Sequence, residues 1–161
     1  FVHYGPKGFQ LDDREQYAGI AEANCKESGG TYLCTDDPEV ALKDADFIYT
    51  DVWYGLYEAE LSEEERMRIF YPKYQVNMDM LSKCSPNVKF LHCLPATRGE
   101  DVTDEVADSD ASLCWEEAGN RLTAMRGLLV YFMRNAEKHS DLEIAAAKES
   151  LDKFLAERIY K

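Results

Sequence analysis

The residues most able to do chemistry stand at the end of one predicted strand. Residues 88–95 read VKFLHCLP, so a mostly apolar run ends in a histidine and a cysteine shortly before Pro95. Proline has no N–H to donate, and it therefore ends the strand. In an open α/β sheet, ligands bind beyond the carboxyl ends of the strands, which makes His92, Cys93 and Leu94 candidate binding residues. The alternative is an ordinary core strand with a buried free thiol.

A Cys–His nucleophile is not expected here. Alternation along a strand sends His92 and Cys93 to opposite faces, whereas a nucleophilic pair needs side chains that point at each other. The end of this strand can instead offer a ligand main-chain carbonyl oxygens and one side chain.

Two further segments carry candidate binding groups. Asp51 falls near the carboxyl end of a predicted strand, and residues 53–58 (WYGLYE) follow it as a loop. An aromatic loop at a strand end can wall a small-ligand site, and it can also simply pack over the core. Arg121 lies in the first turns of a predicted helix, where a cation is unfavourable, so we expect an acid or an anionic ligand to hold it.

Composition restricts the class of protein. The chain has 161 residues, 45% hydrophobic and 12% aromatic, which suits one domain with a real core. A net charge of −13 disfavours nucleic acid and anionic membranes as partners, and it suits a cationic ligand. The longest apolar run is too short to cross a bilayer. Five scattered cysteines without a C-x-x-C pair predict reduced thiols, with neither a disulfide framework nor a zinc site.

Strand-like and helix-like segments alternate along the chain. Helix starts are marked by Asp37 before Pro38 and by a capping box between Ser62 and Glu65. The alternation predicts an α/β fold, doubly wound, with a mainly parallel sheet and helices on both faces. The predicted strands are 1–6 (with its exit turn), 31–35, 45–52, 88–95 and 111–115; the predicted helices are 12–27, 37–42, a segment from 62, 77–84, 103–107, 116–135 and a segment from 140.

The start of the chain carries a further expectation. It begins with Phe1, and residues 1–6 already read as a strand and its exit turn. No signal-peptide pattern precedes them. We therefore expect a piece of a longer protein that begins inside a domain.

Three stretches resemble one enzyme family. The sequences HCLPATRGE at 92–100, TDEV at 103–106 and Asn120-Arg121 at the start of a long helix are similar to the ornithine and putrescine carbamoyltransferases, within the ornithine/aspartate carbamoyltransferase family. The stretch DVWYGLYE at 51–58 looks like the loop of the putrescine-specific members. The Ser-Met-Gly sequence that ornithine enzymes carry there is absent. The similarity covers essentially the whole chain, as the C-terminal half of such an enzyme.

The resemblance implies a reaction and an assembly. Carbamoyl phosphate and putrescine would give N-carbamoylputrescine and phosphate, in agmatine degradation and arginine metabolism, without a cofactor or metal. The chain would belong to a two-domain subunit of a cytoplasmic homotrimer. Residues 1–139 would be its Rossmann-like amine-substrate domain without the first strand, and residues 140–161 an amphipathic helix that contacts the next subunit. The phosphate-binding Ser-Thr-Arg-Thr-Arg and His-Pro-Thr-Gln elements are absent, so we expect this piece alone to be inactive.

The resemblance also assigns roles to residues. Holding two reactants together and stabilising charge on the carbonyl oxygen and phosphate would suffice for this reaction. The family's Leu-Pro bond is cis, so we expect a cis bond between Leu94 and Pro95 that points the Leu94 carbonyl into the site. Arg121 and Cys93 are the expected catalytic residues. The expected substrate-binding residues are His92, Cys93, Leu94, Pro95, Asp51, Trp53, Tyr54, Tyr57, Glu58 and Arg121.

Several alternatives stay open at this point. Either Glu58 or Asp51 could meet the distal ammonium of the amine, and Glu58 could instead be a helix-start acid. Gly119 stands where ornithine-type enzymes have Glu, and Glu116 or Glu117 could fill that place. Ornithine or another amine could be the substrate, and a non-catalytic binding domain could keep the same fold. A nucleotide-binding domain has little support because no G-x-G-x-x-G is present.

Overall fold

The computed structural model describes residues 1–54 and 61–135, together with single positions at 145, 146, 148, 149 and 153. The chain divides into two compact units, Phe1–Ala118 and Gly119–Lys161, and each is described by itself. The predictions for Tyr57, Glu58 and most of the terminal helix concern residues outside this description.

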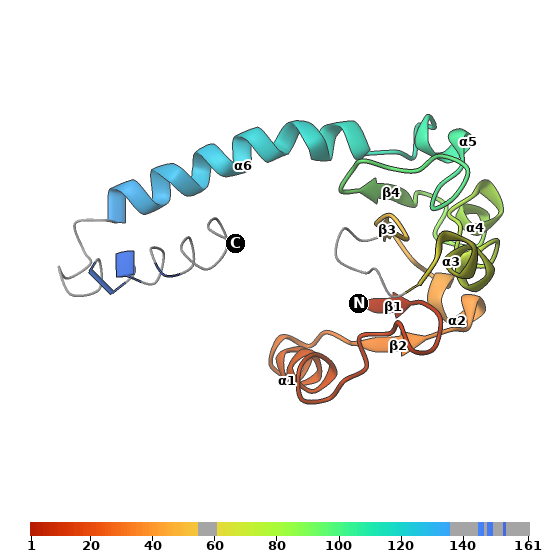
Figure 1. Ribbon diagram of the computed structural model, residues 1–161, viewed down its shortest axis with the longest axis horizontal. Helices are drawn as coiled ribbons and strands as arrows, with labels where there is room; N and C mark the ends of the chain where they lie inside the picture. The colour runs from red at the N-terminus through yellow and green to blue at the C-terminus, as the bar shows by residue number, and fades with distance from the viewer. Residues whose placement is uncertain (55–60, 136–144, 147, 150–152, 154–161) are drawn as a thin grey trace. The chain divides into compact units, whose positions relative to one another are not determined.

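Strands and helices alternate as predicted, which confirms the α/β class (Figure 1). In chain order the elements are β1 (Val2–Tyr4), α1 (Ala18–Ser28), β2 (Leu33–Thr35), α2 (Pro38–Leu42), β3 (Phe47–Thr50), α3 (Glu63–Phe70), α4 (Met78–Ser82), β4 (Lys89–His92), α5 (Asp104–Ala107) and α6 (Cys114–Asn135).

The described strands pair in parallel, as the alternation predicted, but they form two separate pairs. β1 pairs with β2, and β3 pairs with β4. In the second pair Thr50 lies directly beside His92. Both strands therefore end at the same level, and the residues that follow them, Asp51 and Cys93, leave from one edge.

The local sequence signals explain most element boundaries. Gly29 adopts φ 75° and ends α1, since a left-handed residue cannot continue the helix. The Asp37 side chain accepts the Glu39 N–H at the start of α2. Ser62 and Glu65 form both bonds of the predicted capping box at the start of α3.

Two boundaries differ from the sequence prediction. The helix expected from residue 12 begins only at Ala18, because the Asp13 carboxylate accepts the N–H groups of Glu15 and Gln16 and holds a turn there. The prediction of a strand at 111–115 is wrong. It is reduced to a single bridge to Phe90, and Cys114 already begins α6.

The core of the first unit surrounds β4. Phe90, Val102 and Val106 are fully buried, and apolar residues of α2, α4 and α5 pack with them. The buried face of β4 also carries His92. The end of β4 is thus anchored in the best-packed part of the unit.

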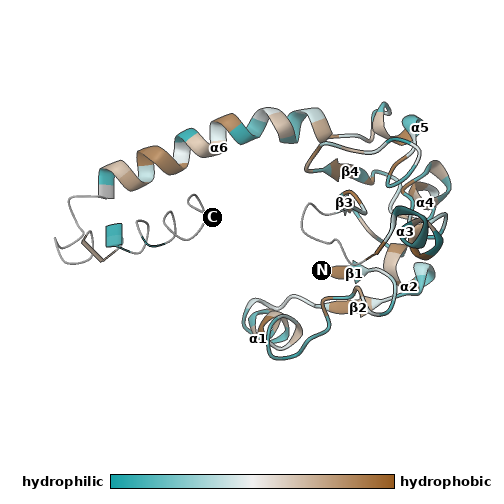
Figure 2. Ribbon diagram, in the orientation of Figure 1, coloured by the Kyte–Doolittle hydropathy of each residue, from teal (hydrophilic) through white to brown (hydrophobic). Residues whose placement is uncertain are grey.

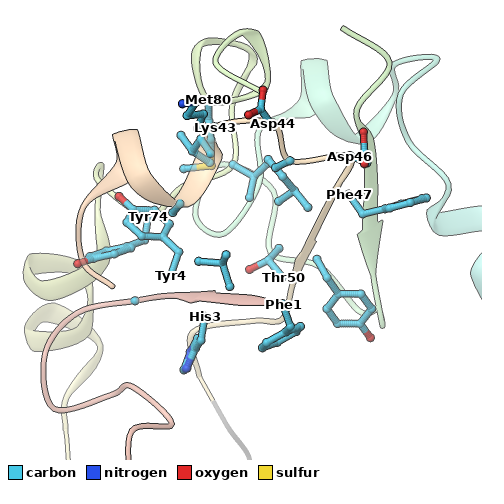
Figure 3. A pocket seen from close by; sticks show the side chains of 18 of the residues that line it. Phe1, His3, Tyr4, Lys43, Asp44, Asp46, Phe47, Thr50, Tyr74 and Met80 are labelled. Carbon is cyan, nitrogen blue, oxygen red and sulfur yellow. The ribbon is translucent and has the colours of Figure 1, made fainter. Parts of the chain in front are cut away.

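A cavity of about 670 Å³ lies along β1 and β3 (Figure 3). The Leu33 N–H bonds to the Phe1 carbonyl, so alternation turns the main-chain groups of Val2 and Tyr4 away from β2. By the same alternation, the bond from the Lys89 N–H to the Asp46 carbonyl turns those of Phe47 and Tyr49 away from β4. Figure 3 shows Tyr4 leaving β1 beside Tyr74, and the two ring centroids are 4.8 Å apart.

Helix α6 alternates apolar and polar residues along its length (Figure 2). Its large apolar residues are exposed, and this set consists of Trp115, Leu122, Met125, Leu128, Leu129, Val130, Tyr131, Phe132 and Met133. Among the described helices, none has the length and apolar character that crossing a membrane requires.

Candidate active site

The site begins with an unusual backbone turn after β4. The bond between Leu94 and Pro95 is cis, as predicted, and Leu94 has φ 54°. A left-handed conformation costs an ordinary L-residue about 1–2 kcal/mol, so contacts around the turn must impose it.

The first of these contacts comes from His92. Its ring is 1% exposed, and its Nδ1 accepts the main-chain N–H of Leu94 at 2.8 Å. A backbone N–H can only donate, so Nδ1 carries no proton. The proton therefore sits on Nε2, which donates to the Asp101 carboxylate at 2.9 Å.

Asp101 connects the two sides of the turn. It is 0% exposed, and its second oxygen accepts the Thr97 N–H at 3.0 Å. One carboxylate thus fixes His92 before Pro95 and Thr97 after it. The sequence analysis assigned no role to Asp101, which lies between the matched stretches 92–100 and 103–106.

A second cluster gathers at the ends of β3 and β4. Burial raises the pKa of the Cys93 thiol, and a hydrogen bond to the Asp51 carboxylate raises it further. Burial also raises the pKa of Tyr49 to about 12, and the neighbouring Cys93 and Glu117 add to that increase. Both groups are therefore held in their protonated, uncharged forms at neutral pH.

Glu117 links this cluster to the turn. Its carboxylate accepts the main-chain N–H of His92 at 3.1 Å and is also a hydrogen-bonding partner of Tyr49. Sequence reasoning gave Glu117 only as a substitute for the carboxylate missing at Gly119. The structure places it, with Asp51, beside Tyr49 and Cys93.

The start of the aromatic loop is part of the packed interior. Trp53 is 8% exposed and stacks on Phe70, with ring centroids 5.5 Å apart. Its carbonyl accepts a 2.7 Å bond from Arg66, which is itself buried. Burial raises the pKa of Tyr54, and Glu100 adds to the effect. Stacking on Phe70 and the bond from Arg66 therefore hold Trp53 in place.

The remaining predicted residues are placed as follows. Pro95 is exposed at the turn, and Arg121 is exposed on α6, within the unit Gly119–Lys161. Gly119 has open space where a side chain would begin. Arg98 forms ion pairs with Asp104 and Asp108, which gives it a structural role that the sequence analysis did not assign. Within the described residues, no group of His, Cys, Asp and Glu side chains could hold a metal ion.

The arrangement has a definite chemical character. Two carboxylates, Asp51 and Glu117, flank an uncharged phenol and thiol, and the adjoining turn has its backbone direction fixed from inside the core. Carboxylates and main-chain carbonyls are acceptors, so this edge suits a ligand rich in N–H donors and positive charge.

Residues 1–132 match the family model of the aspartate/ornithine carbamoyltransferase Asp/Orn-binding domain. The chain belongs to this family. It is 46% identical over 134 residues to the putrescine carbamoyltransferase of Mycoplasma capricolum subsp. capricolum, covering 83% of the chain and 36% of the relative. It is 47% identical over 128 residues to the ornithine carbamoyltransferase of Pyrococcus abyssi, covering 80% and 39%.

Solved structures agree with this assignment. The ornithine carbamoyltransferase from Pyrococcus furiosus superposes with a TM-score of 0.70 at 48% identity, covering 80% of this chain and 40% of that one. The anabolic enzyme from Campylobacter jejuni gives 0.74 at 27% identity. The chain spans less than half the length of these relatives, and they include enzymes named for both amines.

Proposed function

We propose that this chain is the amine-binding part of a carbamoyltransferase that carbamoylates putrescine. The supporting observation is the left-handed turn at Leu94, fixed by buried His92, beside the carboxylates of Asp51 and Glu117. Putrescine is a diamine, so its charge and N–H groups complement those carboxylates and the main-chain carbonyls.

The proposed reaction needs the amine nitrogen to be neutral when it attacks. Its lone pair forms the bond to the carbamoyl carbon, the bond from that carbon to the phosphate oxygen breaks, and the nitrogen loses a proton to the departing phosphate. The carbonyls of Cys93 and Leu94 accept from the attacking amine and from the carbamoyl NH₂. This contact orients the reactants, and no covalent enzyme intermediate is needed.

Arg121 keeps the predicted role of donating to the carbamoyl oxygen or to the phosphate, where it stabilises developing negative charge. Replacing Arg121 with Ala in the full-length protein should lower kcat by two orders of magnitude or more, on the order of the loss seen for one such donor. The matched control is Arg126→Ala, an exposed arginine on the same helix with no assigned role. A kcat of Arg121→Ala equal to that of Arg126→Ala would contradict the proposed role of Arg121 in stabilising negative charge.

The choice of putrescine over ornithine depends on the loop that starts at Trp53, where WYGLYE replaces the ornithine-type sequence. The test compares kcat/KM of the full-length protein for the two amines. A higher value for putrescine supports the proposal. A higher value for ornithine favours the second candidate, ornithine carbamoylation. No turnover of either amine leaves two readings, a carbamoyltransferase for another amine and a non-catalytic binding domain.

We also propose the wider setting that the resemblance implies: a cytoplasmic homotrimer that acts in agmatine degradation. In this proposal residues 1–139 form the amine-substrate domain and residues 140–161 contact the next subunit. Deleting residues 140–161 from the full-length protein should weaken the trimer, measured by sedimentation velocity. An unchanged profile would refute the subunit contact. The isolated chain should show no turnover, because its sequence contains neither the Ser-Thr-Arg-Thr-Arg nor the His-Pro-Thr-Gln element.

A further inference from the structure

The ring of His92 has no hydrogen-bonding capacity left for a ligand. Its Nδ1 is occupied by the Leu94 N–H and its Nε2 by Asp101, and the ring is 1% exposed. Direct contact with the amine would require breaking one of these bonds. The role of the ring must therefore be sought in what it holds.

What it holds is the direction of the peptide between Cys93 and Leu94. Leu94 sits at φ 54°, a conformation that leucine avoids on its own. The bond from its N–H to His92 Nδ1, at 2.8 Å, ties this residue to the buried end of β4. The Leu94 N–H lies in the same planar peptide unit as the Cys93 carbonyl, so this bond fixes the direction in which the Cys93 carbonyl points.

Asp101 determines which nitrogen of the His92 ring carries the proton. Because its carboxylate accepts from Nε2, it keeps the proton there and leaves Nδ1 free to accept. The other oxygen holds Thr97, beyond Pro95, at 3.0 Å. The pair thus fixes both ends of the turn from within the core, where both residues are at most 1% exposed.

We propose that His92 is a positioning residue, which aims the Cys93 main-chain carbonyl at the amine while Asp101 fixes the tautomer of the His92 ring. This inference rests on the proposed carbamoyl transfer and deepens it. In this inference His92 acts on the substrate only through the main chain, and its ring makes no direct contact with the amine. A purely structural histidine would matter only through the packing and hydrogen bonds that it contributes to stability.

Two variants separate these roles, because each keeps one of the two ring bonds. In His92→Asn, the side-chain oxygen can accept the Leu94 N–H two residues on, as in an Asx turn, but the side chain is too short for Asp101. In His92→Gln, the side-chain NH₂ can reach Asp101 in place of Nε2, but nothing accepts the Leu94 N–H. Each loses one hydrogen bond and part of the ring's packing.

The test is made in the full-length protein with two measurements. In His92→Gln, kcat/KM for putrescine should fall about tenfold below that of His92→Asn, the equivalent of one hydrogen bond, with the KM for carbamoyl phosphate equal in both. Amide exchange at Leu94 should likewise be about tenfold faster in His92→Gln. The Val88 N–H, bonded to the Ser85 carbonyl at the other end of β4, is the control and should be unchanged.

Equal kinetics and equal Leu94 exchange in the two variants would overturn the positioning role. If the wild-type protein turns over no amine, the proposed function fails separately, and the exchange rates still decide whether His92 fixes Leu94. A loss in His92→Asn as large as in His92→Gln would mean that the ring contributes stability alone.

Discussion

The buried carboxylate of Asp101 allows a quantitative prediction. It is 0% exposed and accepts from both His92 Nε2 and the Thr97 N–H. In Asp101→Asn, the single amide oxygen can serve only one of these donors, and the NH₂ group faces the other. One buried donor left unsatisfied costs about 1–3 kcal/mol. In Asp101→Ala both donors lose their acceptor, so the cost should rise to about 2–6 kcal/mol.

These values are large beside the total stability of a typical domain, about 5–15 kcal/mol. The assay is urea unfolding of the full-length protein followed by circular dichroism. A loss of 2 kcal/mol with a slope near 2 kcal/mol per molar would lower the midpoint by about 1 M. The matched control is Asp110→Asn, the same substitution at an exposed position nearby, which should stay within about 0.5 kcal/mol of wild type. Equal midpoints for Asp101→Asn and Asp110→Asn would refute the reasoning.

Further predictions concern Cys93 and the capping box. Because the Asp51 carboxylate helps to raise the pKa of Cys93, Asp51→Asn should lower that pKa, so more thiolate exists at pH 8 and iodoacetamide alkylates Cys93 faster. Peptide mass spectrometry measures the rate, with Cys25 as the internal control, and an unchanged rate at Cys93 would contradict the pairing. Ser62→Ala removes the hydroxyl that accepts the Glu65 N–H at the start of α3, and it should lower the free energy of unfolding by about 1 kcal/mol in the same urea assay. Ser82→Ala, which removes a bond to the Asp79 carbonyl within α4 and no cap, should cost less.

Most helices and strands could be predicted from the sequence because the signals that begin and end them are local. The cap at Asp37, the box at Ser62 and the stop at Gly29 act through neighbouring backbone groups, and all three are present. The cis bond before Pro95 followed from the resemblance. The strand predicted at 111–115 shows what local signals miss. β-favouring residues form a strand only where a partner edge continues beside them, and here α6 begins first.

The functional partners were harder to predict because they depend on contacts distant in sequence. Nothing local indicates that Asp101 meets His92, or that Glu117 accepts the His92 N–H from 25 residues away. Tyr49 looked like an ordinary strand residue until the pairing of β3 with β4 brought it to Cys93 and Glu117. His92 was predicted to bind substrate, and that prediction stays untested.

The cavity along β1 and β3 has a practical consequence for handling the chain. Val2, Tyr4, Phe47 and Tyr49 turn their main-chain groups away from their paired strands, and no bond to those groups is found within the described residues. Such edges are templates for strands from other molecules. Preparations of the isolated chain should therefore self-associate as concentration rises, and a β-strand added in cis that pairs with these edges should keep them monodisperse.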